Sequence, residues 1–282
     1  MQFMAFNLHT IRLFIFTLLL AAGQYCFAET NIYASNGYYT SAVTWEKSES
    51  PYILHADVNI EKRGTLIIEP GVEVVGNGNK IKVGGRLYAG YVEGHKNDNP
   101  KNEKVTLKNT YIEAAGIGDR IMNLSHLSMS NGQITSSSSK RILTKEFNLK
   151  DSVLDNTHVD SQYARGNMVL SNNKFIGSRF ELGEFGSDPQ SWHTQIEQNA
   201  SIIINNNTFE NYGSKVEILS HRLKNLTIND NVFKNDSNGI RIEPHWSMDY
   251  GYINDPLIAE IKNNTFTKDT RGIEVKQGKF NI

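Results

Sequence analysis

The chain has 282 residues, with 29 basic and 30 acidic side chains, so its formal net charge is −1. This balance argues against nucleic acid or an anionic membrane surface as an obligatory partner, because both attract strongly basic proteins. Hydrophobic residues make up 39% of the chain, which is enough for one sizeable core but too little for a protein with several membrane spans.

The first 28 residues have the pattern of a secretory signal peptide. A basic region with Arg12 precedes an apolar run over residues 13–22, and small residues lie three positions before the expected cleavage site, at Cys26, and directly before it, at Ala28. That run is much shorter than the ~20 residues a membrane-spanning helix needs. We therefore expect a mature chain from Glu29 that is secreted, periplasmic or on the cell surface and is not transmembrane. Cys26 is the only cysteine, so the mature chain would have no disulfide.

A four-residue element, Asn-Asn-x-Phe with one Asp-Asn-x-Phe variant, recurs in the second half of the chain. The copies lie at 172–175, 206–209, 230–233 and 263–266. Alternating apolar residues precede each copy, and a second short alternating segment follows it, at 180–182, 216–218, 240–242 and 273–275. Weaker copies upstream extend the pattern over most of residues 60–282.

A coil of about 22 residues, with three short strands and tight turns that contain Asn or Gly, is typical of a right-handed parallel β-helix. Asparagine tolerates the left-handed turn conformation, and its amide can hydrogen-bond to the coils above and below. An antiparallel sandwich also explains the alternation, but it does not explain the recurring tetrad. The sequence therefore predicts an all-β, single-stranded right-handed parallel β-helix over residues 61–282, with the phenylalanines stacked inside.

Residues 29–60 are expected to form an N-terminal cap, because the open edge and apolar end of the first coil must be covered. Residues 40–90 resemble the entry segment of secreted bacterial β-helix proteins. The longer spacings between tetrads predict two loop insertions, at 183–200 and 244–257. We find no matching cap after Phe280, so either a short tail suffices or self-association through the C-terminal end covers it.

Acidic residues fall at the outward positions of successive coils, where neighbouring strands lie ~4.8 Å apart. We expect Asp160, Glu181 and Glu217 to lie in one column, followed by Arg241 and Glu274. Stacked carboxylates repel one another unless they share a cation, a proton or an arginine. Three such oxygen donors on a rigid sheet are candidate ligands for Ca²⁺, and a solvated charged face is the alternative.

Aromatic, histidine and arginine residues gather in the loops that leave the same edge of the predicted sheet. Such side chains beside carboxylates suit an extended sugar chain, which stacks its ring faces and hydrogen-bonds through its hydroxyls. The alternative is that the tryptophans pack down as lids over the sheet. The candidate substrate-binding residues are Trp192, His193, Glu243, His245, Trp246, Tyr250 and Tyr252.

The segment Val216-Glu217-Ile218-Leu219-Ser220-His221-Arg222, with Gly239-Ile240-Arg241-Ile242 one coil later, resembles the chondroitinase B and alginate lyase family. That resemblance implies β-elimination on uronate-containing polysaccharides. It places Glu217 at a calcium-ligand position and Arg222 near the family's lysine base, with Arg241 as the assisting arginine. The candidate catalytic residues are Lys215, His221, Arg222 and Arg241.

Three functions follow as expectations. The first is a protein that binds a polysaccharide, expected to be acidic, along one sheet face. The second is a polysaccharide lyase, or an epimerase-like relative, acting on the same material. The third is a non-enzymatic adhesin or matrix protein. Nucleic acid is not an expected partner of any of them.

Overall fold

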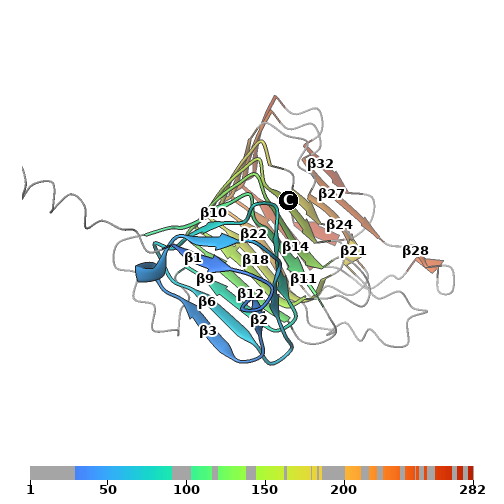
Figure 1. The fold of residues 1–282 in the computed structure, drawn as a ribbon. Helices are drawn as coiled ribbons and strands as arrows, with labels where there is room; N and C mark the ends of the chain where they lie inside the picture. The colour runs from blue at the N-terminus through green and yellow to red at the C-terminus, as the bar shows by residue number, and fades with distance from the viewer. Residues whose placement is uncertain are drawn as a thin grey trace, which may run out of the picture.

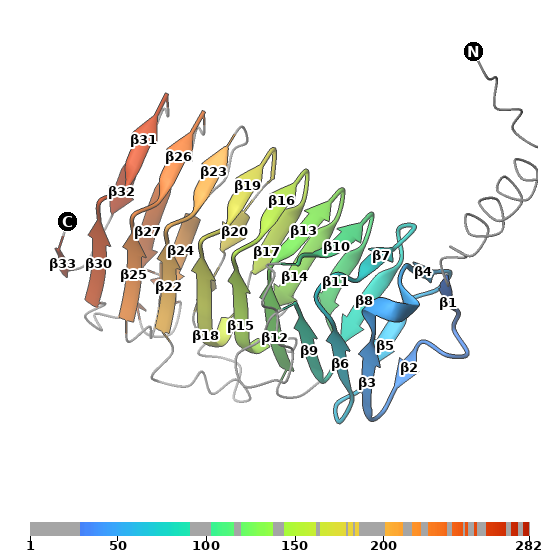
Figure 2. The same ribbon diagram turned by 90° about the vertical axis from the view of Figure 1, so that its left-hand side faces the viewer.

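The computed structural model describes most of the chain from residue 29 onward. The described ranges are 29–90, 103–115, 120–137, 144–161, 164–178, 180–182, 184–185, 201–210, 216–220, 225–235, 239–244, 246–247, 251–252, 258–268, 272–275 and 279–281. Apart from one 3₁₀ turn, η1 (Lys47–Glu49), the regular elements in these ranges are all β-strands. Figure 1 looks along the resulting coil, and Figure 2 shows it from the side.

Three long parallel sheets run side by side along the molecule. Sheet A has ten strands: β1 (Thr30–Ile32), β4 (Tyr52–Leu54), β7 (Glu73–Val75), β10 (Val105–Lys108), β13 (Leu127–Ser130), β16 (Val153–Asp155), β19 (Lys174–Ile176), β23 (Thr208–Glu210), β26 (Val232–Lys234) and β31 (Thr265–Thr267). Sheet B has seven: β2 (Tyr38–Tyr39), β5 (Val58–Ile60), β8 (Lys80–Val83), β11 (Tyr111–Ala114), β14 (Gln133–Ser137), β17 (His158–Ser161) and β20 (Phe180–Leu182).

Sheet C also has ten strands: β3 (Ala42–Trp45), β6 (Thr65–Ile68), β9 (Arg86–Ala89), β12 (Arg120–Ser125), β15 (Thr144–Lys150), β18 (Ala164–Ser171), β22 (Ser201–Asn205), β25 (Asn225–Asn229), β30 (Ile258–Lys262) and β33 (Lys279–Asn281). A further four-stranded sheet, here sheet D, contains β21 (Glu184–Phe185), β24 (Val216–Ser220), β27 (Ile240–Pro244) and β32 (Ile273–Val275). The strands β28 (Trp246–Ser247) and β29 (Gly251–Tyr252) form a separate antiparallel pair.

The chain winds through the sheets in turn, so that each rung runs from one strand of sheet A, through sheet B or in later rungs sheet D, to one strand of sheet C. Sheets A and C each contain ten strands, which defines ten rungs, stacked in chain order along the axis in Figure 2. This architecture confirms the parallel β-helix that the repeat predicted. The segment expected to act as a cap, 29–60, contributes β1 to β5 to the same three sheets, and its role as a cap remains a prediction.

Asparagine occupies the turn between sheets C and A, as the tetrads suggested. The first asparagine or aspartate of each tetrad has a positive φ, for example 58° at Asn172 and 55° at Asn206, in the left-handed region that asparagine tolerates. The second asparagine is directed inward. The Nδ2 of Asn173 donates to Oδ1 of Asn207 at 3.0 Å, and the Nδ2 of Asn207 donates to Oδ1 of Asn231 at 3.0 Å. These bonds tie each rung to the next inside the turn.

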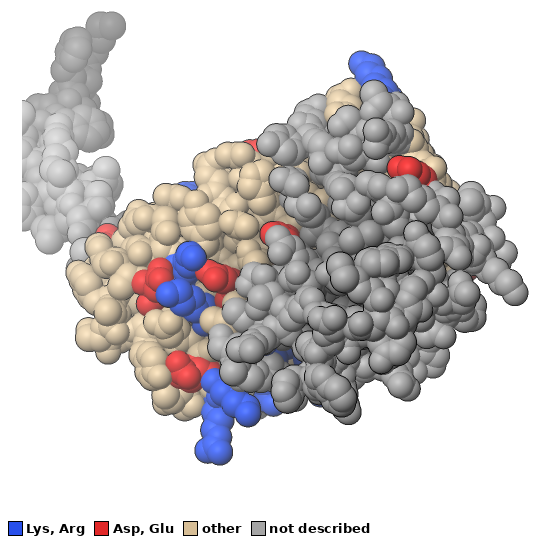
Figure 3. Space-filling view, turned by 90° about the vertical axis from the view of Figure 1, so that its right-hand side faces the viewer, with Lys and Arg blue, Asp and Glu red and all other residues tan. Residues whose placement is uncertain are grey.

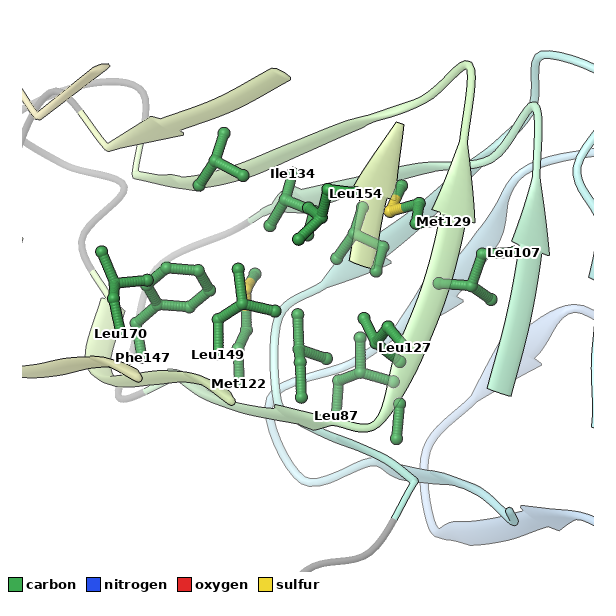
Figure 4. Packing of buried hydrophobic residues seen from close by; sticks show 14 of the residues in the cluster. Leu87, Leu107, Met122, Leu127, Met129, Ile134, Phe147, Leu149, Leu154 and Leu170 are labelled. Atoms are coloured by element: carbon green, nitrogen blue, oxygen red, sulfur yellow. The ribbon is translucent and has the colours of Figure 1, made fainter. Parts of the chain in front are cut away.

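The core is a single apolar column enclosed by the three sheets. Figure 4 shows part of it, where Leu107, Met129 and Leu154 of sheet A face Phe147 and Leu149 of sheet C. Further along, the tetrad phenylalanines stack as expected. The ring centroids of Phe175 and Phe209 lie 4.9 Å apart, those of Phe209 and Phe233 4.9 Å, and those of Phe233 and Phe266 5.0 Å. The four rings thus form one continuous stack through four successive rungs.

Candidate functional site

The outward face of sheet B is built by strict alternation along each short strand. In β8, Ile81 and Val83 are fully buried, whereas Lys80 and Lys82, which alternate with them, are half-buried. In β17, Val159 is buried while His158 and Asp160 on either side are not. Because successive side chains of a strand point to opposite faces, each rung presents two side chains on the outside of this sheet.

Parallel pairing without a break aligns these side chains in two rows along the helix axis. The first row, from β8 to β17, is Lys82, Glu113, Thr135 and Asp160. The second row is Lys80, Tyr111, Gln133 and His158. With rungs ~4.8 Å apart, the two rows form a regular surface of amide, hydroxyl, imidazole, phenol and charged groups.

The charges at the N-terminal end of this face are paired across rungs. The Nζ of Lys80 lies 2.7 Å from Oε2 of Glu113, and the Nζ of Lys82 lies 2.8 Å from Oδ2 of Asp57. The other oxygen of Asp57 accepts a hydrogen bond from the backbone N–H of Lys80 at 2.9 Å. Figure 3 shows acidic and basic atoms lying against one another on the described part of this face.

These contacts shift the pKa values of the Asp57 carboxyl and the Lys80 amine. Partial burial acts to raise the pKa of Asp57, but the hydrogen bonds from Lys82 and from the Lys80 backbone outweigh it, and the pKa is lowered. The hydrogen bond to Glu113 raises the pKa of Lys80. Asp57 and Lys80 are therefore both held in their charged forms.

The predicted acidic column falls into two groups in the structure. Asp160 of β17 pairs with Glu181 of β20, and Arg241 of β27 pairs with Glu217 on one side and Glu274 on the other. Each group occupies one position on neighbouring strands, as the alignment of the repeats indicated. Arg241 therefore lies at a register position between two glutamates.

The join between sheets B and D interrupts that column. The strands β20 and β24 are neighbours, and β21 pairs with β24 through Glu184 opposite Leu219. This pairing is offset by one residue from the alignment that sets Glu181 beside Glu217. The outward charged residues therefore align within sheet B and within sheet D. The described strand pairings do not align Glu181 of sheet B with Glu217 of sheet D.

The remaining candidate residues are described in part. For Arg241, Glu243, Glu181 and Glu217 the structure describes the backbone alone, and Glu243 pairs with Leu219 of β24. Within the expected insertion 244–257, Trp246 and Tyr252 lie opposite one another in the β28–β29 pair. The other candidates fall outside the described residues: Lys215, His221, Arg222, Trp192, His193, His245 and Tyr250.

The earlier rungs of the same face carry polar residues that the tetrad pattern did not predict. Lys80, Tyr111 and Gln133 were not among the candidates, although the register places them in line with His158, beside Asp160. The signal that would have found them is the same alternation in segments 80–83, 111–114 and 133–137. It was harder to recognise because these rungs lack the Asn-Asn-x-Phe tetrad that marks the register.

A calcium site is not evident in the part of the chain that the structure describes. Among those residues, no group of three or more His, Cys, Asp or Glu side chains is placed to hold a metal ion. Of the three predicted ligands only the side chain of Asp160 belongs to that part, and it is half-buried on β17. The described residues also include no helix that is long and apolar enough to cross a membrane.

Comparison of the chain with protein-family models, with curated proteins and with solved structures gave no significant match. The proposed function therefore rests on the fold and on the alignment of the outward residues of sheet B. The resemblance to the chondroitinase B and alginate lyase family stays a prediction from the sequence.

Proposed function

We propose that the protein binds a polysaccharide along the outward face of sheets B and D. The observation that carries the proposal is the register: two parallel rows of polar side chains, one pair for each rung, from β8 to β17. An extended sugar chain presents hydroxyl groups at a similarly regular spacing. A flat, rigid sheet can hold many such weak contacts in place at little cost in side-chain entropy.

The chemistry of the two rows supports a glycan as the partner. Tyr111 offers an aromatic body with a polar tip, and Gln133 offers two donors and an acceptor next to it. On β17, His158 and Asp160 add an imidazole and a carboxylate. Sugar recognition typically combines such groups, because each ring has an apolar face and a polar rim.

Lyase activity on an acidic polysaccharide is the second proposal. Its basis is the position of Arg241 between Glu217 and Glu274, together with the lyase resemblance. In such a reaction His221 or Lys215 would remove the proton next to the uronate carboxylate, and Arg241 would stabilise the charge that develops. The glycosidic C–O bond at the β-carbon would then break as the C=C bond forms, and the leaving sugar oxygen would take up a proton. A Ca²⁺ ion, which the same resemblance implies, would have Asp160 and Glu181 on neighbouring strands as candidate ligands and would supply further charge stabilisation.

The experiment is to incubate the purified protein with a panel of acidic and neutral polysaccharides, with Ca²⁺ and with a chelator. Binding, polymer length and the absorbance of an unsaturated uronate are followed together. Binding without turnover supports the binding protein, and turnover that Arg241→Ala abolishes supports the lyase. Turnover with unchanged polymer length would identify an epimerase. No binding to any polysaccharide refutes the proposal and leaves a non-enzymatic adhesin or matrix role on other molecules.

The matched control for Arg241→Ala is Lys234→Ala. Lys234 is exposed on β26 of sheet A, in the same rung but on another side of the coil. Both substitutions remove one positive charge, so a general effect of net charge on an acidic polymer would appear in both variants. An effect confined to Arg241→Ala would locate the interaction on sheet D.

A further inference from the structure

The tenth rung is less well covered than the ninth. Phe233 and Ile240 of the ninth rung are fully buried. Their partners in the tenth rung are Phe266, which is only partly buried, and Ile273, which is 36% exposed. Inward-facing apolar side chains thus reach the surface at the end of the coil marked by β31 and β32 (Figure 2).

The preceding rungs show what fits against such a surface. Each ring in the stack is covered by the ring of the next rung, and the planes of Phe233 and Phe266 are inclined by only 7°. The strand that carries the covering ring pairs with the strand beneath it, as Phe266 pairs with Phe233 in β31 and β26. The partner that fits over Phe266 is therefore a β-strand with an inward aromatic residue.

The strand β31 also lacks the charges that its predecessors carry. In sheet A, the outward positions of the seventh, eighth and ninth rungs each include one charged residue, Lys174, Glu210 and Lys234. The corresponding positions of β31 are Thr265 and Thr267, both exposed. Natural sheet edges commonly carry lysine or another charge, which prevents pairing with other chains. The two outward residues of β31 are instead uncharged threonines of high β-propensity.

We infer that a second copy of this chain pairs with this edge, so that β31 and its counterpart lie antiparallel about a two-fold axis that passes midway between the two Phe266 residues. In that arrangement Phe266 lies opposite Phe266 of the second copy, and Thr265 faces Thr267 of the second copy. A two-fold contact requires a self-complementary strand, and Thr-Phe-Thr is symmetric about its central residue. Cross-strand threonine pairs are favourable in antiparallel sheets.

The opposite end of the coil does not provide the alternative, a head-to-tail contact. The inward residues of the first rung are Ile32, Tyr39 and Trp45, and these are 4%, 7% and 2% exposed. The Trp45 indole Nε1 already donates to the Tyr39 hydroxyl at 3.1 Å, and the indole stacks on the Tyr52 ring at 4.7 Å. No ring at an inward position of the first rung is therefore exposed to receive Phe266, and the exposed ring of Tyr38 lies at the outward position of β2. The inference is also independent of polysaccharide binding on sheets B and D.

The test is the mass of the purified protein in solution, measured by sedimentation velocity over a range of concentrations. The unmodified chain is expected to form a concentration-dependent species of twice the chain mass. The double variant Thr265→Lys/Thr267→Lys should be monomeric, because the antiparallel register sets lysine against lysine. Thr265→Asp/Thr267→Asp should also be monomeric, because aspartate then faces aspartate. A mixture of the two variants should restore the dimer, because lysine then faces aspartate.

Both substituted side chains, Thr265 and Thr267, are exposed, so the variants test the contact and leave the core unchanged. The control is Thr208→Lys, at the position equivalent to Thr265 two rungs earlier, which should still dimerise. The inference would be overturned if the unmodified protein had the mass of a single chain at every concentration. Open-ended assemblies, or a dimer that survives both double variants, would overturn it as well.

Discussion

The ring of Phe209 lies parallel to that of Phe233, with centroids 4.9 Å apart and planes inclined by 12°. Phe175 covers the opposite face of Phe209 at the same distance. One side chain thus contacts two neighbouring rungs, and the core of the later rungs is continuous through these rings. The stability of the coil should depend on them strongly.

Phe209→Ala is expected to destabilise the protein by about 3–5 kcal/mol, because it leaves a cavity that two flanking rings cannot fill. Phe209→Leu should cost clearly less, since it keeps most of the apolar volume. Urea denaturation followed by circular dichroism measures both. Equal losses for the two variants would show that the ring stack is not the stabilising feature.

Asn207→Ala should be more damaging than a change at the adjacent Asn206. The Asn207 Oδ1 accepts the backbone N–H and the Nδ2 of Asn173, both at 3.0 Å, and Asn207 is 1% exposed. Each buried donor left without a partner costs about 1–3 kcal/mol. Asn206 is exposed with φ 55°, so Asn206→Gly keeps the turn and should be nearly neutral. A similar shift in urea midpoint for both variants would contradict this account.

Two glycines give a matched test of close packing between turns. An alanine Cβ at Gly85 would lie 2.2 Å from the carbonyl oxygen of Gly64, a clash with backbone that cannot move freely. At Gly78, with φ 83°, nothing lies within 4 Å, so alanine there meets only the conformational penalty of about 1 kcal/mol. Gly85→Ala should therefore lower the thermal midpoint far more than Gly78→Ala. Comparable midpoints would refute the close approach.

The Asp57–Lys82 pair predicts a dependence of stability on acidic pH. The folded-state pKa of Asp57 is lowered, so its stabilising effect is fully present above the ordinary carboxyl pKa of 3.8. That contribution is lost as the pH falls through the lowered folded-state value. Asp57→Asn keeps an acceptor for the Lys80 N–H but removes the charge, and its stability should fall less steeply in acid. Parallel curves for the two proteins would mean that this pair contributes nothing to the acid response.

The fold was predictable from the sequence because its determinants are local and repeated. The tetrad at 206–209 places an asparagine in the left-handed turn, an asparagine inside it and a phenylalanine in the core, and each role appears in the structure. The rungs before residue 172 were harder to align. Their turns use other residues, such as His126 and Asp151, at the same positive φ.

For the candidate site, the sequence predicted only which residues lie opposite one another on neighbouring strands. The pairing of Arg241 with Glu217 follows from counting residues after each tetrad, because each of them lies eight residues after its tetrad phenylalanine. The one-residue offset at Glu184 opposite Leu219 was not predictable, since it arises at the start of the expected insertion 183–200, directly after β20. Periodicity does not specify the conformation of such insertions.

The most direct test of the central claim compares two faces of the same rungs. Tyr111→Ala/Gln133→Ala alters the outward face of sheet B, and Thr106→Ala/Ser128→Ala alters sheet A in the same two rungs. Affinity electrophoresis in gels that contain the polysaccharide bound most tightly in the panel gives an apparent Kd for each variant. We predict about tenfold weaker binding for the sheet B variant, equivalent to about 1.4 kcal/mol, and no change for the sheet A variant. Equal affinity of both variants and the unmodified protein would contradict the assignment of polysaccharide binding to sheet B.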